Sequence, residues 1–304
     1  MPRQAELLNP IRSRCDRGCG VNYRTVSQIV AAQDTSDGAG VKLKRSLGSP
    51  ALSQLDPFLM LDEFRSDKAG DYLAGFPDHP HRGFETVTYM LAGAMQHSDH
   101  LGNRGTLAAG GVQWMTAGKG IVHSEMPKQK NGLLWGFQLW INLPARLKMM
   151  PPRYQDIPSD QIPEWKSNAD VRVKVIAGTS NGTSGPVTDI STSPIFLDVA
   201  VPSGGRFEQE IPVGHSGLCY VFEGEGEFGG TGSGVGTPIG SGRLATLSDG
   251  DRVAVTATST RVRFLLLAAK PIGEPVARYG PFVMNTRTEI MQAVEDFQSG
   301  AFKG

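Results

Sequence analysis

Two short segments of the 304-residue sequence place metal-binding side chains two residues apart. The first pair is His79 and His81, and the second pair, further along the chain, is His123 and Glu125. In an extended strand, residues two apart point to the same face, so both members of each pair can reach one ion. If the two strands are neighbours in a small barrel, all four side chains meet at one interior point. We therefore predict a single metal site with these four residues as ligands.

The donor set of this predicted site limits the metals that it can hold. Three neutral imidazoles and one carboxylate suit Fe(II), Mn(II), Ni(II), Cu(II) or Zn(II) better than Mg(II) or Ca(II). For an ion that takes six ligands, two positions remain for water, dioxygen or a substrate. A site with open positions can be catalytic, whereas a site filled by protein alone would be structural.

Several other titratable residues have alternative interpretations. A lone pair of histidines two apart is often incidental, but two pairs that share a face favour a site. Glu85 has the same strand parity as the first pair, so it competes with Glu125 for the carboxylate role; otherwise it lies behind the ligands or at the rim. His97 and His100 are expected at the rim or surface, and His215 is expected to be a structural histidine.

Short strands are the elements that would position these side chains. Thr86–Leu91 is rich in β-branched and aromatic residues and is followed by a glycine, and similar runs recur along most of the chain. The 38 glycines and 20 prolines favour many turns over long helices. The pattern predicts an all-β fold of antiparallel barrels or sandwiches, of which we expect two tandem small barrels.

The end of the chain has a helical pattern instead. Thr286 and Glu289 form a capping-box sequence, in which the hydroxyl and the carboxylate satisfy amides of the first helical turn. The apolar residues that follow recur at helical spacing, and Gly300 can end the helix. We predict a short C-terminal helix that docks on a barrel through the stripe of Ile290, Met291, Val294 and Phe297.

Changes in composition divide the sequence into three parts. Residues 1–24 carry five arginines and little apolar periodicity, so we predict a flexible N-terminal extension, with a targeting segment as the alternative. A proline-rich linker covers residues 144–164. The predicted domains are therefore a metal-binding barrel over 25–150 and a second barrel, with the C-terminal helix, over 151–304.

The two halves also read as diverged copies of one unit. The segment at 86–93 parallels 217–224, with Tyr89 opposite Tyr220, and the segment at 112–117 parallels 252–257. This alignment places Glu210, Pro212, Arg263 and Leu265 at the positions of the four predicted ligands. Because no ligand set survives there, we predict one metal per chain, in the first half.

Charge and cysteine content exclude some classes of protein. Thirty basic and 30 acidic residues give a formal net charge of zero, which argues against direct nucleic-acid binding through phosphates. Three cysteines imply no disulfide framework, so a reducing compartment, the nucleus or the cytoplasm, is expected. No stretch is long and apolar enough to predict a membrane span or a secretion signal.

The sequence resembles the pirin family, a branch of the cupin superfamily. The matching segments are FLMLDEF (58–64), FPDHPHRGFETVTYML (76–91), QWMTAGKGIVHSEMP (113–127) and GPFVMNTRTEI (280–290), and the resemblance covers the chain from about residue 25 onward. It implies a bicupin, in which two cupin-type barrels are followed by a short helix. It also implies one Fe(II)/Fe(III) ion in the first barrel, held by His79, His81, His123 and Glu125, with no substitution. General cupins would use a carboxylate at the Glu85 position instead.

The resemblance implies two kinds of function. Some pirins are quercetin 2,3-dioxygenases, for which a flavonol and dioxygen would be the substrates and Glu125 would be the catalytic general base. Phe76, Met90, Trp114 and Met115 would then be candidates for an apolar pocket wall. Other pirins are nuclear co-regulators that bind transcription factors with sensitivity to the iron oxidation state, and plant relatives are linked to G-protein signalling. We expect a monomer in either case.

Overall fold

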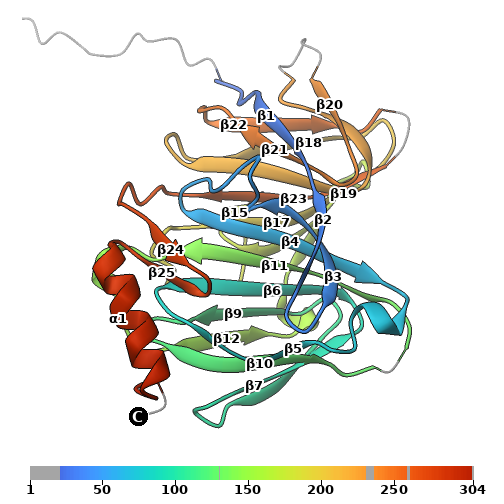
Figure 1. Ribbon diagram of the computed structural model, residues 1–304. Helices are drawn as coiled ribbons and strands as arrows, with labels where there is room; N and C mark the ends of the chain where they lie inside the picture. The colour runs from blue at the N-terminus through green and yellow to red at the C-terminus, as the bar shows by residue number, and fades with distance from the viewer. Residues whose placement is uncertain (1–20, 130, 231–235, 259–260, 303–304) are drawn as a thin grey trace, which may run out of the picture.

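The computed structural model describes residues 21–129, 131–230, 236–258 and 261–302. It consists of two antiparallel β-barrels stacked one on the other, with one α-helix against the side of the first (Figure 1). The predicted all-β fold of two barrels with a C-terminal helix is therefore confirmed. Within the described residues, no helix has the length and apolar character needed to cross a membrane.

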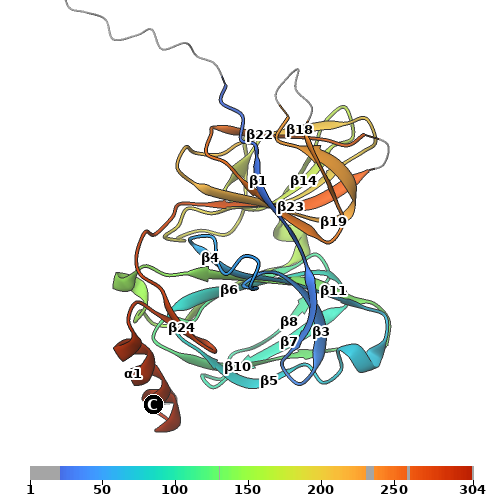
Figure 2. The ribbon, with the colours of Figure 1, turned by 45° about the horizontal axis from the view of Figure 1, so that its top comes forward.

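The first barrel is closed by a seven-stranded and a four-stranded sheet, which Figure 2 shows facing each other. Its longest strands are buried on both faces, because the inner face lines the barrel and the outer face packs on the second barrel. This explains why they read as nearly continuous apolar runs. The larger sheet has the order β12 (Arg153–Ile157), β9 (Val112–Thr116), β6 (Phe84–Ala92), β11 (Leu134–Asn142), β4 (Phe58–Ser66), β3 (Val41–Leu47) and β2 (Gln33–Asp37), and the smaller has β5 (Phe76–His81), β10 (Ile121–Pro127), β7 (Ala94–Asp99) and β8 (Arg104–Ala108).

The second barrel is one ten-stranded sheet whose interior is filled by apolar side chains such as Val173, Val199 and Phe264. Its main path is β1 (Val26–Ala31), β21 (Arg243–Leu247), β19 (Ser216–Phe228), β23 (Val262–Ala269), β17 (Ile195–Val201), β14 (Arg172–Ala177) and β13 (Glu164–Lys166); β18 (Arg206–Glu210), β20 (Thr237–Gly240) and β22 (Arg252–Thr256) complete it. The remaining elements are β15 (Thr179–Ser180), β16 (Thr183–Ser184), β24 (Ala277–Tyr279), β25 (Phe282–Met284), the helix α1 (Arg287–Gln298), and 3-10 turns at Ala69–Asp71, Ala145–Leu147 and Ser159–Gln161.

The predicted domain ranges need correction, because three segments cross them. Strand β1 precedes the first barrel in sequence but pairs with β21 of the second, as its path in Figure 1 shows. Strand β12 follows the predicted boundary at residue 150 but pairs with β9 of the first barrel. Strands β24 and β25 and helix α1 come last in the chain yet pack on the first barrel, partly through a bridge between Arg82 and Phe282. These pairings join distant segments, so local composition could not predict them.

The C-terminal helix has the predicted capping box. The Thr286 hydroxyl accepts a hydrogen bond from the Glu289 amide, and the Glu289 carboxylate accepts one from the Thr286 amide. It docks through Ile290 and Ala293, whereas Met291 of the predicted stripe is 64% exposed. An ion pair of 2.7 Å between Arg82 and Asp296 fixes the helix to the segment that follows β5.

The last residues of the predicted extension are ordered against the second barrel. The Arg24 side chain is fully buried and donates to the carbonyl oxygens of Pro212, His215 and Ser248. The extension therefore ends before residue 21 and does not reach residue 24. Residues 1–20, for which a flexible extension is predicted, lie outside the described residues.

Candidate metal centre

Strands β5 and β10 are antiparallel neighbours, and their register sets His79 directly opposite His123. His81 follows two residues after His79, on the same face. The ring centroids of the three histidines lie 4.4 to 5.0 Å apart, and one nitrogen of each falls within 4.8 Å of the others. The structure therefore brings the three predicted histidine ligands to one point inside the first barrel.

The hydrogen bonding of the three rings fits a bound cation. The Nε2 atoms of His79 and His81 face each other at 3.1 Å, while Nδ1 of His79 lies 2.8 Å from the Pro77 carbonyl oxygen. Because a carbonyl can only accept, it places the His79 proton on Nδ1 and leaves the Nε2 lone pair for a metal. Both ring nitrogens of His123 are buried without a hydrogen-bond partner, and a cation held together with His79 and His81 would give one of them a partner.

Electrostatics keep the two most buried rings neutral. His81 and His123 are 3% and 1% exposed. Burial lowers the pKa of both imidazoles well below the ordinary value, and the neighbouring His79 lowers it further. Neutral imidazole is the form that binds a metal, so no proton has to be displaced from these two rings at neutral pH.

Glu125 lies close to the histidines but is held differently. Against β7 the register of β10 is regular through Glu125, so His123 and Glu125 lie on the same face. Against β5 the pairing shifts, because β5 has one extra residue between His79 and Phe76. The carboxylate is 6% exposed, lines the same cavity as His79 and His81, and accepts a hydrogen bond of 2.9 Å from Thr88 Oγ1. Its oxygens are not within the tight group of histidine nitrogens, so its role as fourth ligand stays a prediction.

His79 and His81 line a cavity of about 540 Å³. Phe76 lines it, as predicted, but Met90, Trp114 and Met115 do not: they pack in three separate cores, because their side chains are committed to neighbouring sheets or to the second barrel. The other lining residues come from both ends of the chain: Asp37, Gly38, Ala39, Leu43, Arg45, Met60, Asp62, Phe64, Pro77, Asp78, Gln138, Trp140, Arg278, Gly280 and Pro281.

Sequence reasoning missed two features of this cavity. Arg45 and Asp62 form a two-bond pair of 2.8 and 2.7 Å in its wall; burial raises the pKa of Asp62, and Arg45 opposes this rise. The Arg278 guanidinium lies 4.8 Å from the centre of the Trp140 ring. Asp62 falls within the FLMLDEF segment, so the resemblance marked its position without a role; Arg278 could not be found, because the last part of the chain was assigned to the other barrel.

The alternative histidines and carboxylate have other places. Glu85 is 2% exposed and accepts 2.6 Å from Thr116 on the outer side of β6, away from the cavity, and burial raises its pKa. The prediction that His97 lies at the rim or surface is wrong, because His97 is 4% exposed and its Nδ1 lies 2.5 Å from the side-chain nitrogen of Gln113. His100 is half-buried and accepts from the Val122 amide.

The second barrel has no equivalent site among its described residues, although the predicted alignment was partly wrong. Tyr89 and Tyr220 do occupy equivalent strands, but the pairing patterns match β9 with β21 and β10 with β22, so 112–117 does not correspond to 252–257. On β18 and β22, the strands equivalent to β5 and β10, Phe207, Gln209 and Val255 are among the buried residues. The apolar pair fills the second barrel, and Gln209 donates to two carbonyl oxygens. Within the part of the chain that the structure describes, His79, His81 and His123 form the one candidate metal group.

Comparisons with known proteins agree with this architecture. Residues 40–141 match the family model "Pirin", and residues 196–303 match "Pirin C-terminal cupin domain". A pirin-like protein of Caulobacter vibrioides is 52% identical over 280 residues, covering 92% of this chain and 99% of its own. A protein of Pseudomonas aeruginosa, provisionally named a quercetin 2,3-dioxygenase, is 48% identical over 91% of this chain and 98% of its own. Human pirin is 41% identical over 91% and 93%.

A solved structure is also similar over most of the chain. The crystal structure of a quercetin 2,3-dioxygenase from Acinetobacter baumannii superimposes with a TM-score of 0.83 at 32% identity, covering 92% of this chain and 98% of that one. Both barrels are therefore shared with that protein, in the same arrangement.

Proposed function

We propose that this chain, which belongs to the pirin family of cupin proteins, is a metal-dependent dioxygenase acting on a flavonol-type substrate. One observation carries the proposal: three imidazoles converge, two of them neutral by burial, and two of the three, His79 and His81, line a cavity of about 540 Å³. The provisional name of the Pseudomonas relative and the similarity to the Acinetobacter quercetin 2,3-dioxygenase support the same reaction.

The shape and lining of the cavity suit a flat aromatic molecule. Its volume lies within the range of ordinary small-molecule sites. Phe64, Phe76 and Trp140 supply aromatic surface on which rings can pack, and Gln138 and Glu125 supply polar atoms that can orient hydroxyl groups. Apolar walls with a few convergent polar groups are typical of such sites.

In this proposal His79, His81 and His123 hold the metal, with Glu125 as the fourth ligand, and the metal is iron. A bound transition metal supplies a Lewis acid that keeps the substrate and dioxygen together. Glu125 is the base that takes the proton of the substrate hydroxyl. Thr88 already bonds to Oε1 of Glu125, so Oε2 is the oxygen available for that proton.

The direct test is aerobic incubation of protein purified without chelators, with its metal content measured, and quercetin. We expect the flavonol absorbance to fall with the wild type and to persist with Glu125→Gln. Glu225→Gln, at an exposed position of β19 in the second barrel, is the control and should act like the wild type. Unchanged absorbance with wild-type protein that carries bound metal would overturn the proposal.

The other roles implied by the resemblance, which are partnership with transcription factors or G-protein subunits and a location in the nucleus or cytoplasm, stay predictions. A metal-loaded protein inactive on flavonols would direct attention to them.

A further inference from the structure

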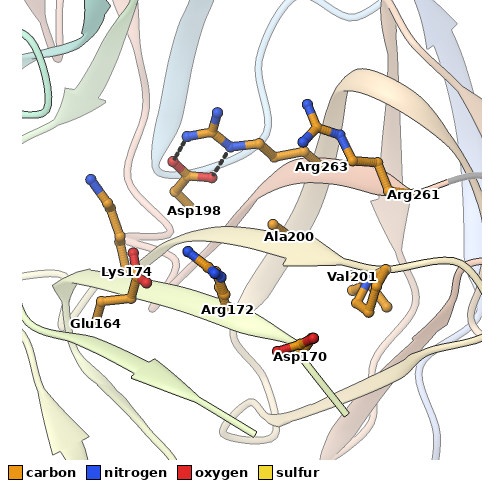
Figure 3. Close-up of a pocket in the computed structure, with 10 residues that line it drawn as sticks. Glu164, Asp170, Arg172, Lys174, Asp198, Ala200, Val201, Arg261 and Arg263 are labelled. Carbon is orange, nitrogen blue, oxygen red and sulfur yellow. Dashed lines mark hydrogen bonds and ion pairs between the residues drawn. The ribbon is translucent and has the colours of Figure 1, made fainter.

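A groove of about 500 Å³ lies on the second barrel, far in sequence from the histidine site. It runs over β13, β14, β17 and β23, on the face of the sheet that also contacts the first barrel through Tyr89 and Asp198. The opposite face of the same strands is committed to the apolar interior of the second barrel. Figure 3 shows the charged side chains that project from the groove face.

The strand register builds a gap between two arginines at the floor of this groove. Arg172, Ala200 and Arg263 are direct cross-strand neighbours on β14, β17 and β23. The two arginines therefore flank one intervening strand, which places their backbones roughly 10 Å from each other. Because Ala200 contributes only a methyl group, the space above it stays open between two long cationic side chains, as Figure 3 shows.

Charges of both signs line this groove: Glu164, the cross-strand neighbour of Lys174, and Asp170 lie near the cations. Asp198 is 2% exposed and is saturated by Tyr89 and by two bonds from Arg263, at 2.9 and 2.6 Å. In the described part of the chain, neither Arg172 nor Lys174 forms a side-chain hydrogen bond or an ion pair. Asp170 pairs with Lys166 instead, so Arg172 and Lys174 keep donors that can bind an added anion.

We propose that this groove binds a small organic anion, whose carboxylate or phosphate group lies over Ala200 between Arg172 and Arg263, with Lys174 as a further donor. Guanidinium groups bind both kinds of oxyanion through paired hydrogen bonds. Val201 and Pro202, at the end of the groove, offer apolar surface to the remainder of such a molecule. The site is separate from the histidine site and does not depend on the proposed dioxygenase activity.

Calorimetric titration of the full chain at low salt tests this proposal, with inorganic pyrophosphate and citrate as separate probes. We expect saturable binding of at least one probe, and the stronger probe identifies the preferred oxyanion. Arg172→Gln combined with Lys174→Gln should weaken binding by about tenfold or more. Ala200→Leu should weaken it as well, because it fills the gap without removing charge.

A matched control removes the same charge elsewhere. Arg243→Gln with Arg287→Gln changes two exposed arginines outside the groove and should leave binding unchanged. Equal weakening by this control, together with wild-type binding in Ala200→Leu, would reduce the effect to diffuse attraction and overturn the proposal. Binding that survives in the Arg172/Lys174 variant would place the anion elsewhere, at the histidine site for example, and would also overturn it. The proposal would also be overturned if neither pyrophosphate nor citrate bound.

Discussion

Tyr89 and Tyr220 occupy the same register position in the two barrels, and each donates its phenolic hydrogen to a buried carboxylate of the other barrel. Tyr89 donates to Asp198 and Tyr220 donates to Glu63, both at 2.6 Å. The two acceptors are also equivalent. In each barrel, the tyrosine faces a residue on the neighbouring strand, and that residue faces the carboxylate residue on the strand after it. The interface between the barrels is therefore a reciprocal pair of polar contacts within an apolar core.

This reciprocity predicts the cost of removing one hydroxyl. Tyr220→Phe leaves Glu63, whose pKa burial already raises, with Trp135 as its remaining side-chain donor. We expect a loss of about 1 to 3 kcal/mol in the free energy of unfolding, measured by urea denaturation, with unchanged metal content. Tyr72→Phe, which removes a hydroxyl bonded to the Gly132 carbonyl near the surface, is the control and should cost less. A Tyr220→Phe variant as stable as the wild type would contradict the assigned contact.

A buried lysine predicts how stability depends on pH. Lys148 donates to Gly83 O, Asn142 Oδ1 and Val283 O, which ties the C-terminal segment to the first barrel. Burial lowers its pKa from 10.5 to about 8. Between these values the unfolded chain holds a proton that the folded chain has released, so the contribution of this group to stability rises with pH across that window.

We therefore expect the difference in unfolding free energy between wild type and Lys148→Met to grow from pH 8 to pH 10, by less than about 1.4 kcal/mol per pH unit. At pH 7 the variant should be less stable by about 1 to 3 kcal/mol, because it leaves three buried acceptors unpaired. Urea unfolding at several pH values measures both effects. The exposed Lys119→Met should show neither; a pH-independent difference for Lys148→Met would refute the assignment.

The hydrogen bond from the Thr88 hydroxyl to Glu125 predicts that its loss lowers turnover without loss of metal. The hydroxyl lies 2.9 Å from Glu125 Oε1 and 2.8 Å from the side-chain amide of Gln138. Thr88→Val keeps the shape but frees the carboxylate, so we expect quercetin turnover to fall about tenfold or more while metal content is retained, with partial rescue by Thr88→Ser. A shift in the acidic limb of the pH–rate profile would separate this positioning role from a merely structural one.

Thr86→Val provides the control on the same strand, since Thr86 is equally buried and points the same way. Its turnover should match the wild type. If both valine variants lose activity equally, the hydroxyl of Thr88 has no particular role.

The candidate site was predictable where it depended on local geometry. The alternation of side chains along a strand is a property of any short segment, so spacing alone could assign His79 and His81 to one face, and His123 and Glu125 to another shared face. That the two strands are neighbours was an assumption, which the pairing of β5 with β10 confirms. The distance of Glu125 from the histidines could not be predicted in the same way, because it depends on how β10 pairs with β5, and β5 has one extra residue between His79 and Phe76.

The domain boundaries failed for a related reason. Strands β1 and β12 and the C-terminal segment join the barrel to which they are not adjacent in sequence, and these pairings depend on contacts between distant residues. Composition could locate a proline-rich stretch near residue 150, but not the sheet that the next strand would enter. Because the C-terminal segment packs on the first barrel, Arg278 and Pro281 line the histidine cavity.

The metal content of purified protein tests the central claim most directly. Elemental analysis of the wild type, His81→Ala and His100→Ala, each checked for folding by its unfolding curve, compares a proposed ligand with a histidine outside the cluster. We expect one transition-metal ion per chain in the wild type and in His100→Ala, and almost none in His81→Ala. A metal-free wild type, or a folded His81→Ala variant that keeps its full metal content, would contradict the assignment of a metal centre to His79, His81 and His123.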